Sequence, residues 1–153
     1  DIINLRVKHR EPFRPFAPAI PLERCADYFE RGYPSPFMLL VYNVLAHRRD
    51  EVPSITHVDG TARVQTVDKR IDPVFHSLVE EFGRKTGTPV LLNTSFNVRG
   101  EPIVNSPEQA VSCFLGTEMD ALALGNRWIE KPPGFQTLPT SKLALPAAKR
   151  ELD

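Results

Sequence analysis

The feature that most constrains this chain is a proline-rich basic segment near its start. Residues 7–21 read V-K-H-R-E-P-F-R-P-F-A-P-A-I-P, with a proline at every third position from Pro12 to Pro21. This is the period of a polyproline II helix, and each proline fixes φ and removes a backbone donor. The segment therefore predicts a stiff loop rather than the interior of a helix or a central strand.

The same segment concentrates cationic side chains. Lys8, Arg10 and Arg14 lie with His9 within seven positions, and two phenylalanines are interleaved with them. Cations held in fixed places suit an anion, above all a phosphate, because lysine supplies a point charge and arginine a bidentate fork. Two other interpretations remain open at this point: a solvated basic loop, and a PxxP ligand for the aromatic groove of a partner.

Composition narrows the class of protein. A length of 153 residues, with 41% apolar and 25% charged residues, is typical of one soluble globular domain with a sizeable core. The formal net charge of zero argues against a general nucleic-acid binder, but not against a local basic pocket. Cys25 and Cys113 are too few and too far apart for a disulfide framework, so we expect buried free thiols.

Location and completeness are also constrained. The longest apolar run is too short to cross a bilayer, and the sequence shows no signal peptide, so we expect a cytoplasmic protein. Because the chain does not begin with methionine, we expect it to be a fragment of a longer protein.

Three helices are predicted. Asp72 as N-cap, Pro73 at the first position and Gly87 at the end delimit the clearest helix. Its expected buried face consists of Val74, Phe75, Leu78, Val79 and Phe82. Ser106 and Gly116 delimit a second helix that starts with a capping box, and residues 22–29 predict a short amphipathic helix.

Strands are predicted between these helices. The expected strands are residues 2–7, 37–45, 54–58, 61–67, 89–92 and 120–124. Residues 37–45 are nearly all apolar, which predicts burial on both faces, and Asp59-Gly60 predicts a hairpin turn. The helix-then-strand order indicates an α/β protein with a twisted, mixed, open sheet and flanking helices. The periodicity ends near residue 131, so residues 132–153 predict a mobile tail.

A polar segment follows the strand at 89–92. It reads N-T-S-F-N-V-R-G and contains Asn93, Ser95, Asn97 and Arg99. In open α/β sheets ligands gather at the carboxyl ends of strands, and if this strand continues, the first three side chains project to one face. The alternative is an Asx/Ser turn that satisfies its own backbone.

Arg63 is the remaining candidate ligand. It lies on the strand predicted at 61–67, which holds a phosphate ligand more rigidly than a loop does. The sequence has no P-loop, no dinucleotide fingerprint and no Cys/His cluster with zinc spacing. His57 and Asp59 lie two residues apart, and a structural role is favoured over metal binding for this pair.

Four segments read together resemble a known family. They are residues 8–18 (K-H-R-E-P-F-R-P-F-A-P), 56–65 (T-H-V-D-G-T-A-R-V-Q), 91–104 (L-L-N-T-S-F-N-V-R-G-E-P-I-V) and the P-E pair at 107–108. Roughly from Ile3 to Lys131, the chain resembles the C-terminal domain of the nodulation protein U and cephamycin-type O-carbamoyltransferases. Three long motifs in the right order make this resemblance specific.

The resemblance implies a YrdC-like fold and a two-domain enzyme. Residues 1–131 would form the C-terminal domain, which makes carbamoyl-adenylate from carbamoyl phosphate and ATP with Mg²⁺. The N-terminal domain of the same polypeptide would be an actin-like, metal-binding domain that transfers the carbamoyl group to a hydroxyl. Its metal-binding histidines have no counterpart in this chain, so the final transfer and the metal site are expected in that other domain.

The resemblance also assigns roles to residues. The matching positions that would line the nucleotide and carbamoyl phosphate pocket are Lys8, Arg14, Arg63, Asn93 and Ser95. We expect Lys8, Arg14, Arg63 and Ser95 to act in catalysis, and no residue is required as a covalent nucleophile. Neighbouring positions add further binding candidates, namely Arg10, Asn97 and Arg99.

Two alternatives remain. The chain could be a non-catalytic YrdC-like module that binds nucleotide, RNA or a protein partner, although zero net charge weighs against RNA. It could also be a stable fragment that is inactive without the N-terminal domain. No membrane partner is expected.

Overall fold

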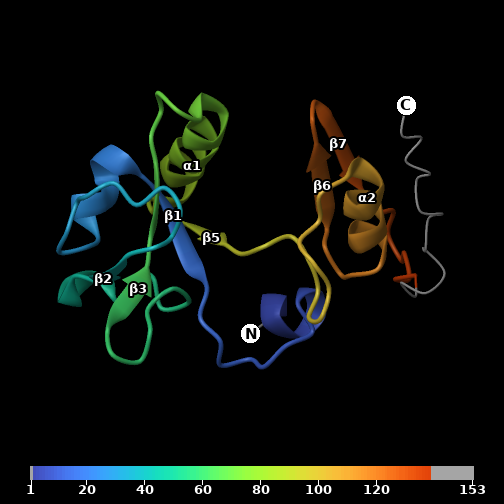
Figure 1. Ribbon diagram of the computed structural model, residues 1–153, viewed down its shortest axis with the longest axis horizontal. Helices are drawn as coiled ribbons and strands as arrows, with labels where there is room; N and C mark the ends of the chain where they lie inside the picture. Colours follow the sequence, from blue (N-terminus) through green and yellow to red (C-terminus); the bar gives the residue numbers. More distant parts are fainter. Residues whose placement is uncertain (1, 139–153) are drawn as a thin grey trace, which may run out of the picture. The chain divides into compact units, whose positions relative to one another are not determined.

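Two compact units make up the chain. The computed structural model describes residues 2–138 (Figure 1). We call Asp1–Arg14 with Ser95–Asp153 the terminal unit, and Pro15–Thr94 the central unit. Each unit has its own strands, its own helices and its own buried side chains.

A three-stranded mixed sheet forms the centre of the central unit. Strand β1 (Ala17–Pro21) lies between β4 (Gln65–Val67), which is parallel to it, and β5 (Leu91–Asn93), which is antiparallel. Helix α1 (Pro73–Thr86) packs beside β1, as Figure 1 shows. The prediction of a mixed α/β sheet with flanking helices is therefore confirmed.

The remaining elements of the central unit surround this sheet. Strands β2 (Val41–Asn43) and β3 (Thr61–Arg63) form an antiparallel pair. Two short 3₁₀ helices complete the unit, η2 (Leu22–Asp27) and η3 (Ala46–Arg48). The amphipathic helix predicted at 22–29 is thus present, but it adopts the tighter 3₁₀ geometry.

The proline-rich segment forms a strand that sequence reasoning excluded. Pro18 and Pro21 both lie in β1, the middle strand of the sheet, and both are buried. The registers explain why this is tolerated: Pro18 is opposite a residue of β5 only, and Pro21 is opposite a residue of β4 only. Ala19 is paired on both sides, so the missing proline donors fall where one neighbour is absent.

Two other strand predictions are wrong, and a third is too long. Residues 2–7 contain a π-helix, η1 (Ile3–Val7), instead of a strand. Residues 37–45 supply only β2, and Leu39 and Val41 are exposed, so burial on both faces is wrong as well. Residues 54–58 form no strand, because the His57–Gly60 turn closes onto Thr61 while β3 pairs with β2.

Helix α1 has the predicted ends but not the predicted buried face. The Asp72 carboxylate accepts a hydrogen bond from the Phe75 amide at 2.9 Å, and Gly87 ends the helix at φ +86°. Val79 of the predicted face is buried, but Val74 is 80% exposed, and the helix also buries His76, which was not predicted. The buried face is therefore rotated away from the most apolar stripe of the helix.

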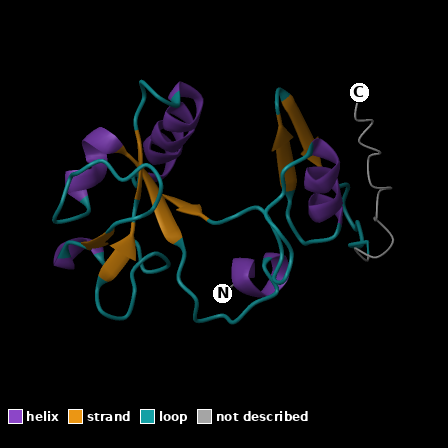
Figure 2. Ribbon diagram, viewed as in Figure 1, coloured by secondary structure: helices purple, strands orange, loops and turns teal. Residues whose placement is uncertain are grey.

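The terminal unit combines η1 with a helix and a hairpin. Helix α2 (Pro107–Leu115) starts where the Ser106 hydroxyl accepts from the Gln109 amide at 3.3 Å. Strands β6 (Ala121–Leu124) and β7 (Arg127–Glu130) form the antiparallel hairpin seen beside α2 in Figure 2. Its core is small and consists of Ala110, Phe114 and Leu122.

The cysteines and the end of the described chain complete the fold. Both cysteines are free and buried, as predicted, and burial raises the pKa of the Cys25 thiol to about 11. Most of the predicted tail, residues 139–153, lies outside the described residues, although the Leu138 amide still donates to the Leu115 carbonyl. Between residues 2 and 138, no helix combines the length and apolar character that crossing a bilayer requires.

One carboxylate joins three segments of the central unit. Glu51 accepts hydrogen bonds from the Tyr28 hydroxyl at 2.6 Å and from the Thr88 hydroxyl at 2.7 Å, and it pairs with Arg48 at 2.7 Å. The hydrogen bonds from Tyr28 and then Thr88 lower the pKa of the Glu51 carboxyl to about 2. Its ionised form is therefore favoured in the folded state.

We expect Glu51→Gln to lower the free energy of unfolding by about 1 kcal/mol at pH 7, because solvent screens part of the hydrogen-bond energy. A folded pKa below the ordinary value of 4.5 stabilises the fold above about pH 4.5. This stabilisation is lost as the pH falls to about 2, so the variant should lose less stability over that interval. Thermal unfolding at pH 7, 4 and 2.5 measures this, with the exposed neighbour Asp50→Asn as control. An acid sensitivity equal to that of the parent chain would contradict the prediction.

Candidate anion-binding site

Lys8 is buried inside the terminal unit. Its side chain is held between the end of η1 and the loop that starts at Ser95, and the residue is only 4% exposed. The ammonium donates to the carbonyl oxygens of Ser95 at 2.7 Å and Asn97 at 2.6 Å, and to Asn97 Oδ1 at 2.7 Å. An ammonium has three hydrogens, so these acceptors use its full capacity. Lys8 therefore orders the loop, and its predicted role as a phosphate ligand stays a prediction.

The loop held by Lys8 closes on itself. The Ser95 hydroxyl donates to Asn97 Oδ1 at 2.6 Å, and the Asn97 amide donates to the Glu101 carbonyl at 2.8 Å. The backbone amide of Arg99 donates to the Lys8 carbonyl at 3.2 Å. Strand β5 ends at Asn93, so Ser95 and Asn97 do not share a strand face with it. Ser95 and Asn97 meet instead because both bind the same ammonium.

Asn4 is a site residue that sequence reasoning missed. It is 1% exposed, and its amide donates to the carbonyls of Arg14 at 2.8 Å and Pro12 at 3.1 Å. Its Oδ1 accepts from Arg10 Nε at 2.7 Å. Asn4 thus fixes the path of residues 8–14, which we call the basic loop, and one of its guanidinium groups. The available signal was an isolated amide in the aliphatic run I-I-N-L.

Positive charge gathers around this loop. Glu11 Oε1 lies 3.0 Å from Arg99 Nη1, and its Oε2 lies 3.9 Å from Arg14 Nη1. Burial lowers the pKa of Lys8, and the charge of Arg10 lowers it further. Burial and the charge of Arg14 likewise lower the pKa of Arg10. Arg14 and Arg99 therefore share the carboxylate of Glu11, and this excess of positive charge favours the binding of another anion.

Two predicted site residues lie in the central unit. Arg63 is exposed on β3, opposite Val41 in the ladder. The Asn93 amide donates to Gln65 Oε1, and Asn93 is paired with Ala17 of β1. The prediction that Arg63 and Asn93 share one pocket with Lys8 and Arg14 stays a prediction.

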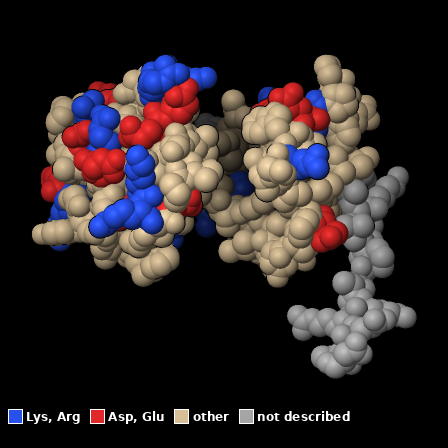
Figure 3. All heavy atoms as spheres, turned by 90° about the horizontal axis from the view of Figure 1, so that it is seen from above, with Lys and Arg blue, Asp and Glu red and all other residues tan. Residues whose placement is uncertain are grey.

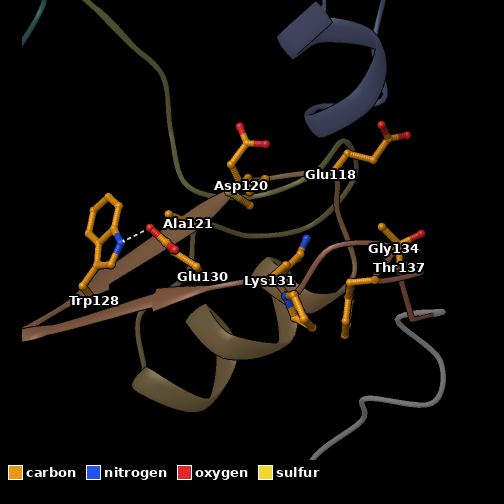
Figure 4. Close-up of a pocket in the computed structure, with 11 residues that line it drawn as sticks. Glu118, Asp120, Ala121, Trp128, Glu130, Lys131, Gly134 and Thr137 are labelled. Atoms are coloured by element: carbon orange, nitrogen blue, oxygen red, sulfur yellow. Dashed lines mark hydrogen bonds between the residues drawn. The ribbon is translucent and has the colours of Figure 1, made fainter.

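The terminal unit also contains a hollow whose charge differs from that of the basic loop. It measures about 540 Å³ and is shown in Figure 4, where Trp128 donates to Glu130. Its lining includes the carboxylates of Glu118, Asp120 and Glu130, and the ammonium of Lys131 binds the Thr117 carbonyl. A lining rich in carboxylates repels phosphate, so the anion site is better placed at the basic loop.

A comparison with known families agrees with the motifs. The profile described as "Carbamoyltransferase C-terminus" matches residues 1–131 of this chain. The chain belongs to the carbamoyltransferase C-terminus family. This confirms the resemblance carried by the four motifs.

Three relatives illustrate which proteins this chain is similar to. The uncharacterized protein sll1178 of Synechocystis is 46% identical over 82% of this chain and 24% of its own length. Nodulation protein NolNO of Sinorhizobium fredii is 44% identical over 86% of this chain and 20% of its own length. The 3'-hydroxymethylcephem-O-carbamoyltransferase of Amycolatopsis lactamdurans is 33% identical over 84% of this chain and 24% of its own length. The chain thus spans about a fifth to a quarter of the length of these relatives.

The role of Lys8 can be tested by hydrogen exchange. Lys8→Met removes the donor to the Ser95 and Asn97 carbonyl oxygens, so we expect a loss of about 3 kcal/mol in stability. Backbone amides of residues 95–101 should exchange faster, since the ammonium no longer orders the loop. Exchange read by mass spectrometry measures this.

The matched control is Arg6→Met, which removes an exposed cation that pairs with Glu118 at 3.8 Å in the same unit. It should leave exchange in the loop unchanged. Equal exchange rates in the Lys8 variant and the parent chain would show that the loop does not depend on the ammonium.

Proposed function

We propose that this chain binds carbamoyl phosphate and ATP and forms carbamoyl-adenylate, as one part of an O-carbamoyltransferase. The observation that carries the proposal is the cluster of Arg10, Arg14 and Arg99 around a loop ordered by Lys8. Both substrates are phosphate anions, and fixed guanidinium groups are the usual ligands of such groups. Membership of the carbamoyltransferase family supports the choice of the carbamoyl group.

The proposed half-reaction replaces the phosphate group of carbamoyl phosphate with the adenylate group of ATP. Water cleaves the bond between phosphorus and the carbamoyl oxygen, which releases phosphate and carbamate. A carbamate oxygen then attacks the α-phosphorus of ATP, and pyrophosphate leaves with its bonding electrons. Negative charge builds on the phosphate oxygens in this step, so positioned cations do most of the catalytic work. Mg²⁺ arrives with ATP as part of the substrate.

The exposed guanidinium groups are the proposed phosphate ligands. Arg14 and Arg99 lie mainly in solvent, and their shared partner Glu11 is partly exposed. Ion pairs of this kind contribute little to stability, so a phosphate can displace the carboxylate at low cost. Arg10 is fixed by Asn4, which reduces the reorganisation that binding requires.

Lys8 and Ser95 have supporting parts in this proposal. Lys8 acts as a positioning residue, because its hydrogens are already used by the loop. Ser95 is exposed, and its hydroxyl can donate to a phosphate or carbamoyl oxygen when that oxygen replaces Asn97 Oδ1 as its acceptor. Arg63 and Asn93 are proposed as further ligands of these substrates. Transfer of the carbamoyl group to a hydroxyl is assigned to an additional, N-terminal domain.

Arg14→Met tests the phosphate site directly. Loss of a charge-assisted hydrogen bond costs about 1.5–3 kcal/mol, which raises the dissociation constant roughly ten- to a hundredfold. Arg63→Ala should also abolish tight binding of both ligands. Isothermal titration with carbamoyl phosphate and with a non-hydrolysable ATP analogue measures both effects.

The control is Arg84→Met, which removes an exposed arginine of α1 that pairs with Glu81 at 2.6 Å. It should bind both ligands like the parent chain. Unchanged affinity in the Arg14 variant would refute the proposed site. Steeply salt-dependent binding of RNA in place of both ligands would favour the alternative of a nucleic-acid module.

A further inference from the structure

A second cluster of polar side chains lies in the central unit. Glu23 of η2 and His76 and Glu80 of α1 each offer one ligand atom, and these atoms all lie within 4.8 Å of one another. His76 and Glu80 are four residues apart, so the helix places them on one face. Glu23 is 53 residues before His76, and its Oε1 lies 2.7 Å from His76 Nε2.

The cluster contains a polar atom without a partner. Glu80 Oε1 has no contact with solvent and no hydrogen-bond partner in the described part of the chain. Burying an unpaired carboxylate oxygen is costly, and such groups in folded proteins are normally paired or bound to a metal ion. His76 is also buried, at 5% exposure. This side of α1 therefore carries ligand atoms that the fold itself does not fully satisfy.

Nearby cations are engaged with other carboxylates. Arg24, whose charge interacts with that of Glu80, pairs with Asp27 at 2.7 Å. Asp68, whose charge acts on Glu23, pairs with Arg70 at 2.6 Å. The cluster thus keeps a surplus of carboxylate groups next to one imidazole, and a divalent cation would offset this surplus.

We propose that Glu23, His76 and Glu80 bind a divalent transition-metal ion of the zinc class. One imidazole nitrogen with two carboxylate oxygens is a ligand set that suits Zn²⁺, and three protein ligands leave a fourth position for water. The Glu23 side chain is 56% exposed, so the ion can enter from its side. The ion would join η2 to α1 and stabilise the central unit.

This site is independent of the anion site. Its ligands belong to the central unit, whereas Lys8, Arg10, Arg14 and Arg99 belong to the terminal unit. The sequence predicted no metal site, because Glu23 is far from the helical pair and no local spacing motif results. The inference does not depend on the proposed carbamoyl chemistry.

Metal titration tests the inference on the metal-free chain. We expect isothermal titration to show one Zn²⁺ per chain and a rise in the melting temperature on binding. Co²⁺ in place of Zn²⁺ should give visible absorption bands typical of a nitrogen and oxygen ligand set. Glu80→Gln and Glu23→Gln should each weaken binding at least tenfold, and Glu23→Gln changes a largely exposed side chain, so folding is preserved.

Matched controls separate this site from general metal binding. Glu81→Gln changes the neighbouring carboxylate of α1, and His57→Gln changes a histidine that contacts Thr61. Both should bind Zn²⁺ like the parent chain. The proposal is overturned if the parent chain binds no Zn²⁺ at millimolar concentration, or if the Glu23 and Glu80 variants bind it with unchanged affinity.

Discussion

The buried ammonium of Lys8 is the interaction on which the candidate anion site depends. Removing a charge from water is costly, and the structure offsets this cost with two carbonyl oxygens and one amide oxygen at short distances. The same contacts draw Ser95 and Asn97 together and bring the backbone of Arg99 against the basic loop. The exposed arginines are thereby mounted on ordered backbone, which lowers the conformational cost of binding an anion.

Local features of the chain were predictable from the sequence, and long-range pairing was not. The caps of α1 and α2 are confirmed at Asp72 and Ser106, because each cap involves residues within one turn. Strand predictions failed where partners are remote: β1 contains prolines, yet its registers with β4 and β5 leave each proline paired on one side only. The buried face of α1 also depends on tertiary packing, which overrides the apolar periodicity of its sequence.

The candidate site was predictable in its residue types but not in its internal organisation. Cationic and amide side chains do gather around the basic loop, as Lys8, Arg10 and Asn97 show. The contacts of Lys8 were not predictable, because only the folded chain reveals that the Ser95 loop accepts hydrogen bonds from its ammonium. Asn4 was missed for the same reason, since its partners lie eight and ten residues ahead in an irregular loop.

The formal net charge of the chain does not describe the local charge at its candidate sites. Figure 3 shows basic and acidic side chains interspersed on one face of the central unit, and the formal net charge is zero. The local charge, however, differs in sign between the two sites. Two arginines pair with Glu11 at the basic loop. Two glutamates lie beside His76 of α1. Interactions beyond about 10 Å are screened at physiological salt, so a ligand senses mainly its nearest groups. A chain of zero net charge can therefore hold an anion at one site and a divalent cation at another.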